Sequence, residues 1–270
     1  MAQGTHALPH DVLGAHRHGG AVTIRTMRPW ADAVDVVLPS GERTPLEHEH
    51  EGVWVGVVDT EDVPDYRLDV RYGDHEPVRV DDPYRFLPTV GDVDLHLIGE
   101  GRHEQLWTVL GAHLRTYPGQ MGEVVGTSFA VWAPHARAIR VVGDFNHWDG
   151  VAHPMRALGS TGVWELFVPD VGEGSRYKFE ILGSDGVRRQ KADPMARATE
   201  APPATASVVT ASHHTWADDA WMAQRASSDP HSSPMSTYEV HLGSWREGLD
   251  YRQLAEQLTE YLVEAGFTHV

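Results

Sequence analysis

Short segments in which apolar and polar residues alternate make up most of this chain. The clearest example spans residues 127–149, TSFAVWAPHARAIRVVGDFNHWD. Phe129 and Val131 alternate with small or polar neighbours, Pro134 interrupts the pattern, and a second apolar run follows. Alternation with a period of two is typical of half-buried β-strands, and proline breaks such runs. The pattern predicts two neighbouring strands joined by a corner.

Similar segments occur on both sides of this stretch. In the first half the predicted strands span residues 21–27, 34–38, 53–58, 66–72 and 77–80. In the second half they span 127–132, 138–142, 163–168, 176–182 and 207–210, and a short helix is predicted between the halves over 104–110. Many short strands separated by Gly, Pro and Asp are typical of β-sandwiches. We therefore expect a mainly β fold with an immunoglobulin-like β-sandwich in each half.

An internal repeat relates the two halves. The pentapeptide Val-Leu-Gly-Ala-His occurs at residues 12–16 and again at 109–113. Further matches in the same order are Gly-Val-Trp at 52–54 and 162–164, Tyr66 and Tyr177, and Asp-Pro at 82–83 and 193–194. Such self-similarity indicates an internal duplication, here of two related β modules.

The second module has extra residues in one loop. The spacing between copies grows from 105 residues at Pro29 and Pro134 to 110 at Gly52 and Gly162, so the insertion follows Val142. There the sequence reads Gly-Asp-Phe-Asn-His-Trp-Asp-Gly. Gly, Asp and Asn are typical of turns, but a turn does not require the two large aromatic residues. Loops added to a fixed scaffold often carry function.

The aromatic loop allows two interpretations. Trp148 can lie against the face of a sugar ring while Asn146 and other polar neighbours bind its hydroxyls, as in a site for a neutral ligand. Alternatively, Trp148 folds back over the edge of its own sandwich and serves packing. The first module has no aromatic residue in the equivalent turn at 39–42, so a ligand role would belong to the second module.

A polar segment separates the two β modules from a region that has a different pattern of apolar residues. Residues 227–234, Ser-Ser-Asp-Pro-His-Ser-Ser-Pro, predict a linker. Residues 235–242 are strand-like, Asp250 can cap a leucine-rich helix, and residues 267–270 begin another strand. Strand, helix and strand form a βαβ unit of a parallel sheet. We therefore expect three domains, at residues 1–105, 106–226 and 227–270.

The composition and net charge exclude several classes of binding partner. The formal net charge of −17, from 22 Lys and Arg against 39 Asp and Glu, argues against nucleic acid or an anionic membrane as the partner. No segment is apolar enough to span a membrane and no signal peptide is recognisable, so we expect a cytoplasmic protein. The absence of cysteine excludes disulfides and thiolate metal sites. His48 and His50 lie in an acidic run that predicts a solvated loop, and we expect neither a metal nor a cofactor.

Three segments give the chain a family resemblance. They are residues 127–150, YEVHLGSWR at 238–246 and GFTHV at 266–270. The chain closely resembles the N-terminal part of a bacterial glycogen branching enzyme of the α-amylase superfamily. This resemblance implies that the first module is the extra N-terminal sandwich of the longer bacterial enzymes. It also implies that the last domain holds the first strand, the helix and part of the second strand of a TIM (β/α)8 barrel.

The resemblance implies a glycosyltransferase that forms α-1,6 branches in glycogen. Such an enzyme cuts an α-1,4-glucan, holds the cut chain on an aspartate and transfers it to a 6-hydroxyl, with retaining two-carboxylate chemistry. In the family, the catalytic motifs lie beyond the segment seen here, so no catalytic residue is identified in this chain. A barrel takes about 250 residues, and residues 235–270 supply 36. We expect a chain cut short within its barrel that is inactive alone and contacts the missing barrel in the whole enzyme.

The resemblance also implies an α-glucan site in the second module. Trp148 matches the family's loop tryptophan, Lys178 matches a lysine that reaches sugar hydroxyls in glucan-binding relatives, and Phe145 and Asn146 complete the expected site. Residues 187–189, Val-Arg-Arg, stand where the best glucan binders have a second tryptophan, so we expect weak binding. The alternatives are a free-standing glucan-binding or scaffold module, and a second module that only packs against the barrel.

Overall fold

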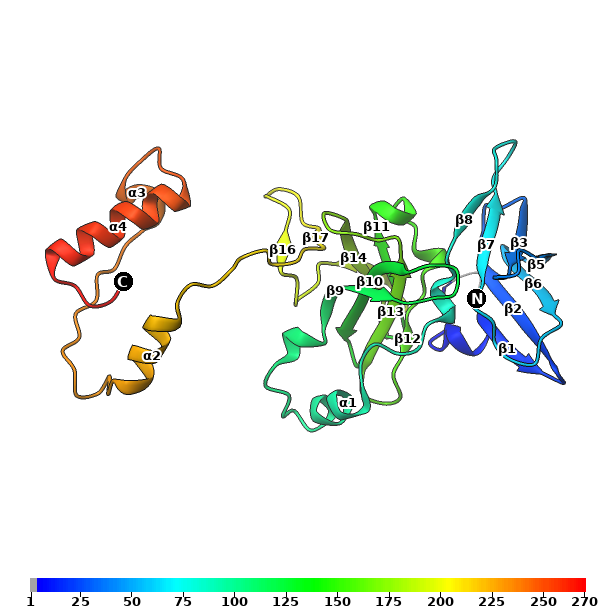
Figure 1. Ribbon diagram of the computed structural model, residues 1–270, viewed down its shortest axis with the longest axis horizontal. Helices are drawn as coiled ribbons and strands as arrows, with labels where there is room; N and C mark the ends of the chain where they lie inside the picture. Colours follow the sequence, from blue (N-terminus) through cyan, green and yellow to red (C-terminus); the bar gives the residue numbers. More distant parts are fainter. Residues whose placement is uncertain (1–3) are drawn as a thin grey trace. The chain divides into compact units, whose positions relative to one another are not determined.

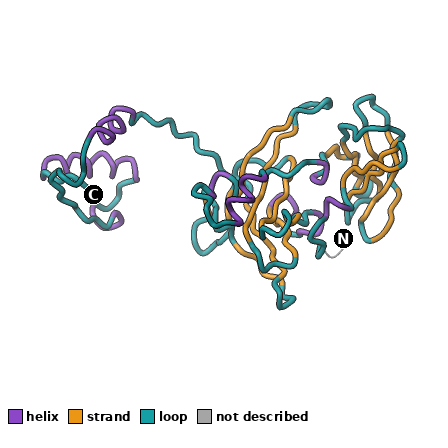
Figure 2. The backbone as a smooth tube through the Cα atoms, turned by 90° about the horizontal axis from the view of Figure 1, so that it is seen from below, coloured by secondary structure: helices purple, strands orange, loops and turns teal. Residues whose placement is uncertain are grey.

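Two compact units make up the structure, a computed structural model that describes residues 4–270. One unit extends to Ser212 and the other runs from His213 to Val270. The first unit contains two antiparallel β-sandwiches, drawn in blue to cyan and in green to yellow in Figure 1. The tube in Figure 2 shows the same strands as two neighbouring groups. The mainly β fold with two tandem sandwiches is confirmed.

The first sandwich consists of two four-stranded sheets, with orders β1-β2-β6-β5 and β4-β3-β7-β8. Its strands are β1 (Gly14–His18), β2 (Ala21–Met27), β3 (Ala33–Val37), β4 (Arg43–Pro45), β5 (Glu47–His50), β6 (Val53–Val58), β7 (Arg67–Arg71) and β8 (Val78–Val80). Where a solvated loop was expected around His48, the chain forms β5, which pairs with β6 and is exposed along its length. This edge strand pairs with one neighbour only, and the His48 ring also lies against Trp54, with centroids 5.1 Å apart. Its residues are exposed and therefore show no apolar alternation.

The second sandwich repeats this plan. Its sheets have the orders β12-β13-β10-β9 and β11-β14-β17-β16, with β15 also paired to β14. The strands are β9 (Gly111–Tyr117), β10 (Val124–Trp132), β11 (Ala138–Gly143), β12 (Arg156–Ala157), β13 (Val163–Pro169), β14 (Arg176–Leu182), β15 (Arg188–Lys191), β16 (Ala198–Thr199) and β17 (Ser207–Val208). Phe129, Ile139 and Phe179 point inward and are fully buried, as alternation predicts.

Matching hydrogen bonds confirm the internal repeat. The buried hydroxyl of Tyr66 donates to Asp82 at 2.8 Å, and that of Tyr177 donates to Asp193 at 2.6 Å. The corners also match, because the indole N–H groups of Trp54 and Trp164 donate to the carbonyls of Arg28 and Ala133, both at 3.1 Å. Equivalent residues of the two modules therefore make the same side-chain hydrogen bonds.

A continuous core joins the two sandwiches. Leu13, Met27 and Tyr84 of the first module are buried in the same cluster as Phe129 and Leu166 of the second. The Tyr84 hydroxyl lies 3.0 Å and 3.2 Å from the carbonyl oxygens of residues 152 and 154. The junction between the sandwiches is therefore a fixed part of this unit.

The helix predicted over 104–110 is wrong. This region has one 3-10 turn, Leu106–Thr108, after which Gly111 takes a φ of +100° and starts β9. The α-helix lies upstream instead, as α1 (Asp92–Gly99). Its sequence has little apolar periodicity, so the residue pattern did not indicate it.

The second unit is small and mainly helical. It contains α2 (Asp219–Ser227), α3 (Leu242–Trp245) and α4 (Tyr251–Ala265). Helix α4 begins as predicted, because the Asp250 carboxylate accepts from the amides of Arg252 and Gln253 at 2.9 Å, and it ends at Gly266, with φ +76°. The strand predicted over 235–242 is reduced to one parallel bridge between Thr237 and His269.

Parallel strands are normally covered on both faces by further elements, which explains why strand pairing in the second unit extends no further.

Among residues 4–270, the structure contains no helix with the length and apolarity needed to cross a membrane.

Candidate functional site

The aromatic loop of the second module has an uncommon backbone. It leaves β11 at Gly143, makes a 3-10 turn over Asp144–Asn146, and then places His147 and Trp148 in the left-handed region, with φ of +53° and +63°. Non-glycine residues seldom adopt positive φ, and two in succession require support from their surroundings. Contacts with the rest of the module must therefore hold the loop in this conformation.

Asn146 supplies much of that support. Its Oδ1 accepts from the Gly143 amide at 2.9 Å, and its Nδ2 donates to the Val141 carbonyl and to Nδ1 of His153, both at 3.0 Å. The amide of Trp148 also donates to the Gly143 carbonyl at 3.0 Å. Asn146, predicted as a sugar contact, uses both ends of its amide within the loop and so positions Trp148.

Phe145 also packs inside the molecule. Its ring stacks on Phe129, with centroids 5.8 Å apart, and meets His153 edge-on at 5.7 Å. Burial lowers the pKa of His153 to about 3, so this imidazole is neutral. These contacts fix the base of the loop, and a direct role for Phe145 in binding stays a prediction.

Trp148 is half-buried, and its side chain is the smallest of the influences that lower the pKa of Asp144. Arg176 makes a two-pronged ion pair with the same carboxylate, through Nε and Nη2, both at 2.9 Å. The Arg176 hydrogen bonds are the main cause that lowers the pKa of Asp144. Asp144 therefore stays ionised and ties the start of the loop to Arg176, the first residue of β14.

Lys178 lies on the same face as Arg176, because the two are separated by one inward residue of β14. In the sheet, Lys178 is paired with Val142 of β11, directly before the loop. Its Nζ donates to the Thr205 hydroxyl at 2.8 Å. The structure thus places Lys178 on the strand that pairs with β11 directly before the Trp148 loop, and its contact with a sugar stays a prediction.

Asp144 and Arg176, which complete this face, were not predicted from the sequence. Asp144 starts the loop and Arg176 precedes Tyr177, but the two residues are 32 positions apart. Only the pairing of β11 with β14 reveals that they meet. Ion pairs of this kind orient a ring and leave free lone pairs for hydroxyl groups.

The position of the absent second tryptophan is occupied by charged residues. Arg188 on β15 reaches Glu180 and the Gly4 carbonyl, both at 3.4 Å. Arg189 donates to Asp185 at 2.7 Å and 3.1 Å. These side chains offer no stacking surface, so Trp148 is the aromatic platform that this face presents from the expected motif.

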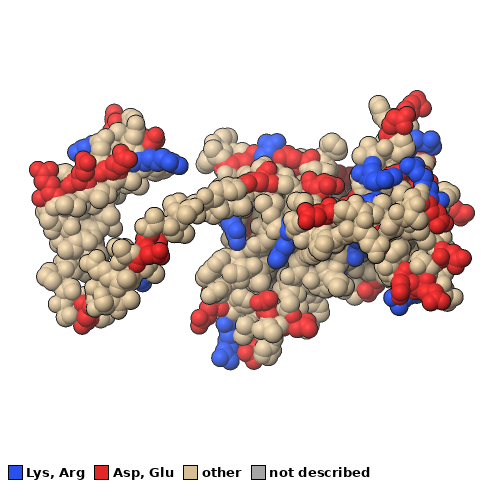
Figure 3. Space-filling view, viewed as in Figure 1, with Lys and Arg blue, Asp and Glu red and all other residues tan. Residues whose placement is uncertain are grey.

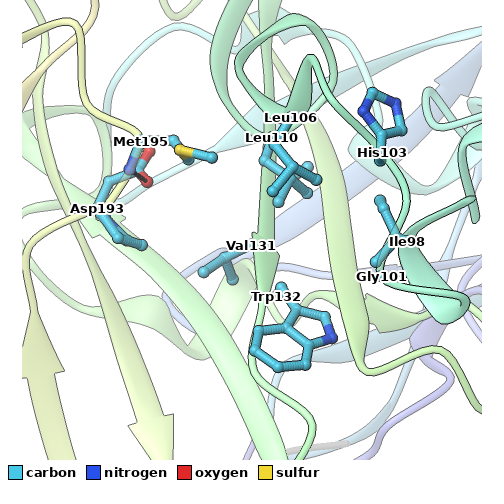
Figure 4. A pocket seen from close by; sticks show the side chains of 11 residues that line it. Ile98, Gly101, His103, Leu106, Leu110, Val131, Trp132, Asp193 and Met195 are labelled. Carbon is cyan, nitrogen blue, oxygen red and sulfur yellow. Dashed lines mark hydrogen bonds between the residues drawn. The ribbon is translucent and has the colours of Figure 1, made fainter.

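A separate cavity of about 390 Å³ lies beside α1 (Figure 4). In Figure 4, Leu106 and Leu110 lie across the cavity from the indole of Trp132, and Met195 closes another side. Its polar members have partners, because Asp193 accepts from Tyr177 and the His103 ring lies 3.0 Å from Asp94. This mainly apolar cavity offers few groups to a hydroxyl-rich ligand.

Each module contains a segment that is similar to a known protein family. Residues 109–196 match carbohydrate-binding module 48 (isoamylase N-terminal domain), and residues 1–84 match the alpha-1,4-glucan branching enzyme GlgB, N-terminal domain. The whole chain is 60% identical to 1,4-alpha-glucan branching enzyme GlgB of Thermobifida fusca, of which it covers 36%. The chain is similar over its full length to the N-terminal part of bacterial 1,4-alpha-glucan branching enzymes.

Other branching enzymes show the same relation. The chain is 60% identical to GlgB 1 of Streptomyces coelicolor and 57% identical to GlgB of Rhodococcus jostii, and covers 34% and 37% of them. The resemblance expected from the motifs is confirmed. The chain spans about a third of the length of these curated relatives, and neither matched segment is a catalytic domain.

Proposed function

We propose that this chain is the glucan-holding, non-catalytic part of a 1,4-alpha-glucan branching enzyme, in which Trp148 and Lys178 bind an α-1,4-glucan. The observation that carries the proposal is the hydrogen-bonded loop of Trp148, which follows the strand paired with that of Lys178, within the segment that matches module 48. The indole face covers a glucose ring, and the ammonium donates to its hydroxyls. Phe145 and Asn146 support binding by holding the loop.

We further propose that the chain acts as part of a longer branching enzyme. Its barrel, which would begin at residues 235–270, cuts an α-1,4 bond and forms an α-1,6 branch by retaining transfer. The domains are then 1–105, 106–226 and 227–270, with the two sandwiches in contact with the barrel. A cytoplasmic location is supported by a composition without cysteine.

A second candidate function is that of a rigid scaffold. It is favoured by the internal use of Phe145 and Asn146 and by the charged residues Arg188 and Arg189. In that case the second sandwich would only support the barrel, and Trp148 would be a packing residue. Glucan binding by the chain alone separates the two functions.

Calorimetric titration of the chain with maltoheptaose tests the proposal. One stacked ring and a few hydroxyl bonds give an expected dissociation constant of about 1 mM. Lys178→Ala removes one charged donor and should weaken binding about fivefold. The matched control is Lys191→Ala, because Lys191 is an exposed lysine on β15. No binding by the wild type up to about 20 mM ligand would favour the scaffold function, and equal affinities for the wild type and both variants would exclude Lys178 as a sugar contact.

A further inference from the structure

A cleft of about 880 Å³ lies between the two sandwiches. The first module lines it with Arg28, Trp30 and Tyr72, and the second lines it with loop residues His147 and Asp149, among others. The volume lies within the range of small-molecule binding pockets. Because a shared core joins the sandwiches, the cleft has fixed walls.

Trp30 stands on a rigid corner at this cleft, with 75% of its surface exposed. The corner closes through a bond from the Ala31 amide to the Arg28 carbonyl at 3.2 Å, and the Trp54 indole donates to the same carbonyl. Gly52 packs beneath it so closely that a Cβ would lie 2.3 Å from the Cα of Pro29. The exposed indole therefore has a defined position.

Tyr72 provides a second exposed ring, at the end of β7, with 40% of its surface accessible. Asp32 ties its turn to the corner of Trp30, because the Asp32 amide donates to the Arg71 carbonyl at 2.9 Å and its carboxylate accepts from the Gly73 amide. A single exposed aromatic residue needs no explanation, but two on adjoining, fixed turns at one cleft form a platform.

The internal repeat shows that neither ring belongs to the sandwich framework. The second module has His135 at the position of Trp30 and Gly183 at the position of Tyr72. The equivalent corner keeps its hydrogen bonds, from the Ala136 amide and the Trp164 indole to the Ala133 carbonyl, without an aromatic residue. Folding of a module therefore does not require these rings.

The polar groups of the cleft favour a neutral ligand. Asp149 and Asp170 line it from the second module, and carboxylates accept hydrogen bonds from hydroxyl groups. Acidic side chains are also spread over both sandwiches on the face drawn in Figure 3, and the net charge is −17, which disfavours anions. Aromatic faces with hydroxyl acceptors suit a sugar.

We propose that this cleft is a second α-glucan site, in which Trp30 and Tyr72 stack on glucose rings and Asp149 and Asp170 accept from their hydroxyls. The identity of the sugar rests on the proposed function, whereas the location rests on the cleft. His147 and Asp149 flank Trp148, so one loop serves both sites. A glucan that reaches both gains avidity, because its second contact is intramolecular.

The test follows the indole N–H signals of the chain, labelled with 15N at its nine tryptophans, during titration with maltoheptaose. Trp30→Ala and Trp148→Ala assign the two signals. The Trp30 signal should shift saturably, both in the wild type and in Trp148→Ala. Tyr72→Ala should weaken binding at Trp30 about tenfold and leave the affinity at Trp148 unchanged. Trp107, which is 57% exposed away from the cleft, is the internal control and should not shift.

The outcomes separate the two sites. A shift at Trp148 without one at Trp30, up to about 20 mM ligand, overturns the cleft site and leaves the proposed function intact. A shift at Trp30 alone supports the cleft and overturns the Trp148 site. A shift at neither tryptophan overturns both.

Discussion

Single side chains decide whether the loop of Trp148 presents its ring. Trp148 was singled out by the loop motif and Lys178 by the family resemblance, and the role of both in binding stays a prediction. The positioning role of Asn146 was not predictable, since its partners include His153, which enters the site only when the next segment folds under the loop. The same holds for Asp144 and Arg176, which meet through strand pairing.

His153 leads to a prediction about pH. Burial, followed by the positive charge of Arg28, lowers its pKa from 6.5 to about 3. Below pH 6.5 the unfolded chain therefore binds a proton that the native protein does not, so the free energy of unfolding falls as pH drops toward 3. This group should cost about 2 kcal/mol between pH 6.5 and 5.

Urea denaturation of the wild type and His153→Gln at these two pH values measures that cost. The variant should lose about 2 kcal/mol less than the wild type, because glutamine does not titrate. Comparing the two proteins cancels the effects of other titrating groups on stability. One of them is Asp81, because burial raises its pKa to about 6 and its effect therefore has the opposite sign. Equal losses in both proteins would show that His153 titrates normally.

Strands and helices were predictable where apolar side chains mark their buried face. The central strands β2, β6, β10, β13 and β14 all lie within or next to predicted segments. The strands β1, β4, β5, β9, β12, β15 and β16 were missed, because each pairs with one neighbour only and few of their residues are buried. Both ends of helix α4 were predictable, because Asp250 caps its first turn and Gly266 ends its last turn.

The repeated tyrosine–aspartate pair gives a prediction for both modules. Tyr66→Phe and Tyr177→Phe each remove the hydroxyl that donates to a buried carboxylate, and burial already raises the pKa of Asp82 and Asp193. Each variant should lower the free energy of unfolding by about 1–3 kcal/mol. Tyr72→Phe, at an exposed site, is the control and should change it little. A large loss in only one module would argue against equivalent roles for the two pairs.

The whole molecule divides into a well-packed unit and a sparsely packed one. The two sandwiches share an extensive core, whereas Leu254 and Leu258 are the buried apolar side chains of α4, and Tyr251 and Val263 are exposed. The sequence indicated the start of a parallel α/β fold at this end. It could not indicate how much of that fold forms here, because parallel strands depend on covering elements.

Hydrogen exchange should reflect this division. Amides of α4 should exchange much faster than those of β10 and β13, because segments with few buried apolar contacts open at low free energy. Mass spectrometry of exchanged peptides measures both regions in one sample. Exchange of α4 as slow as that of the sandwich strands would contradict the prediction.

Electrophoresis through gels that contain glycogen tests most directly whether this chain holds α-glucan through Trp148. The wild type should be retarded relative to a glycogen-free gel. Trp148→Ala should recover most of its mobility, and Trp107→Ala, an exposed control, should remain retarded. Retardation of a folded Trp148→Ala variant equal to that of the wild type would contradict the account and make Trp148 a packing residue.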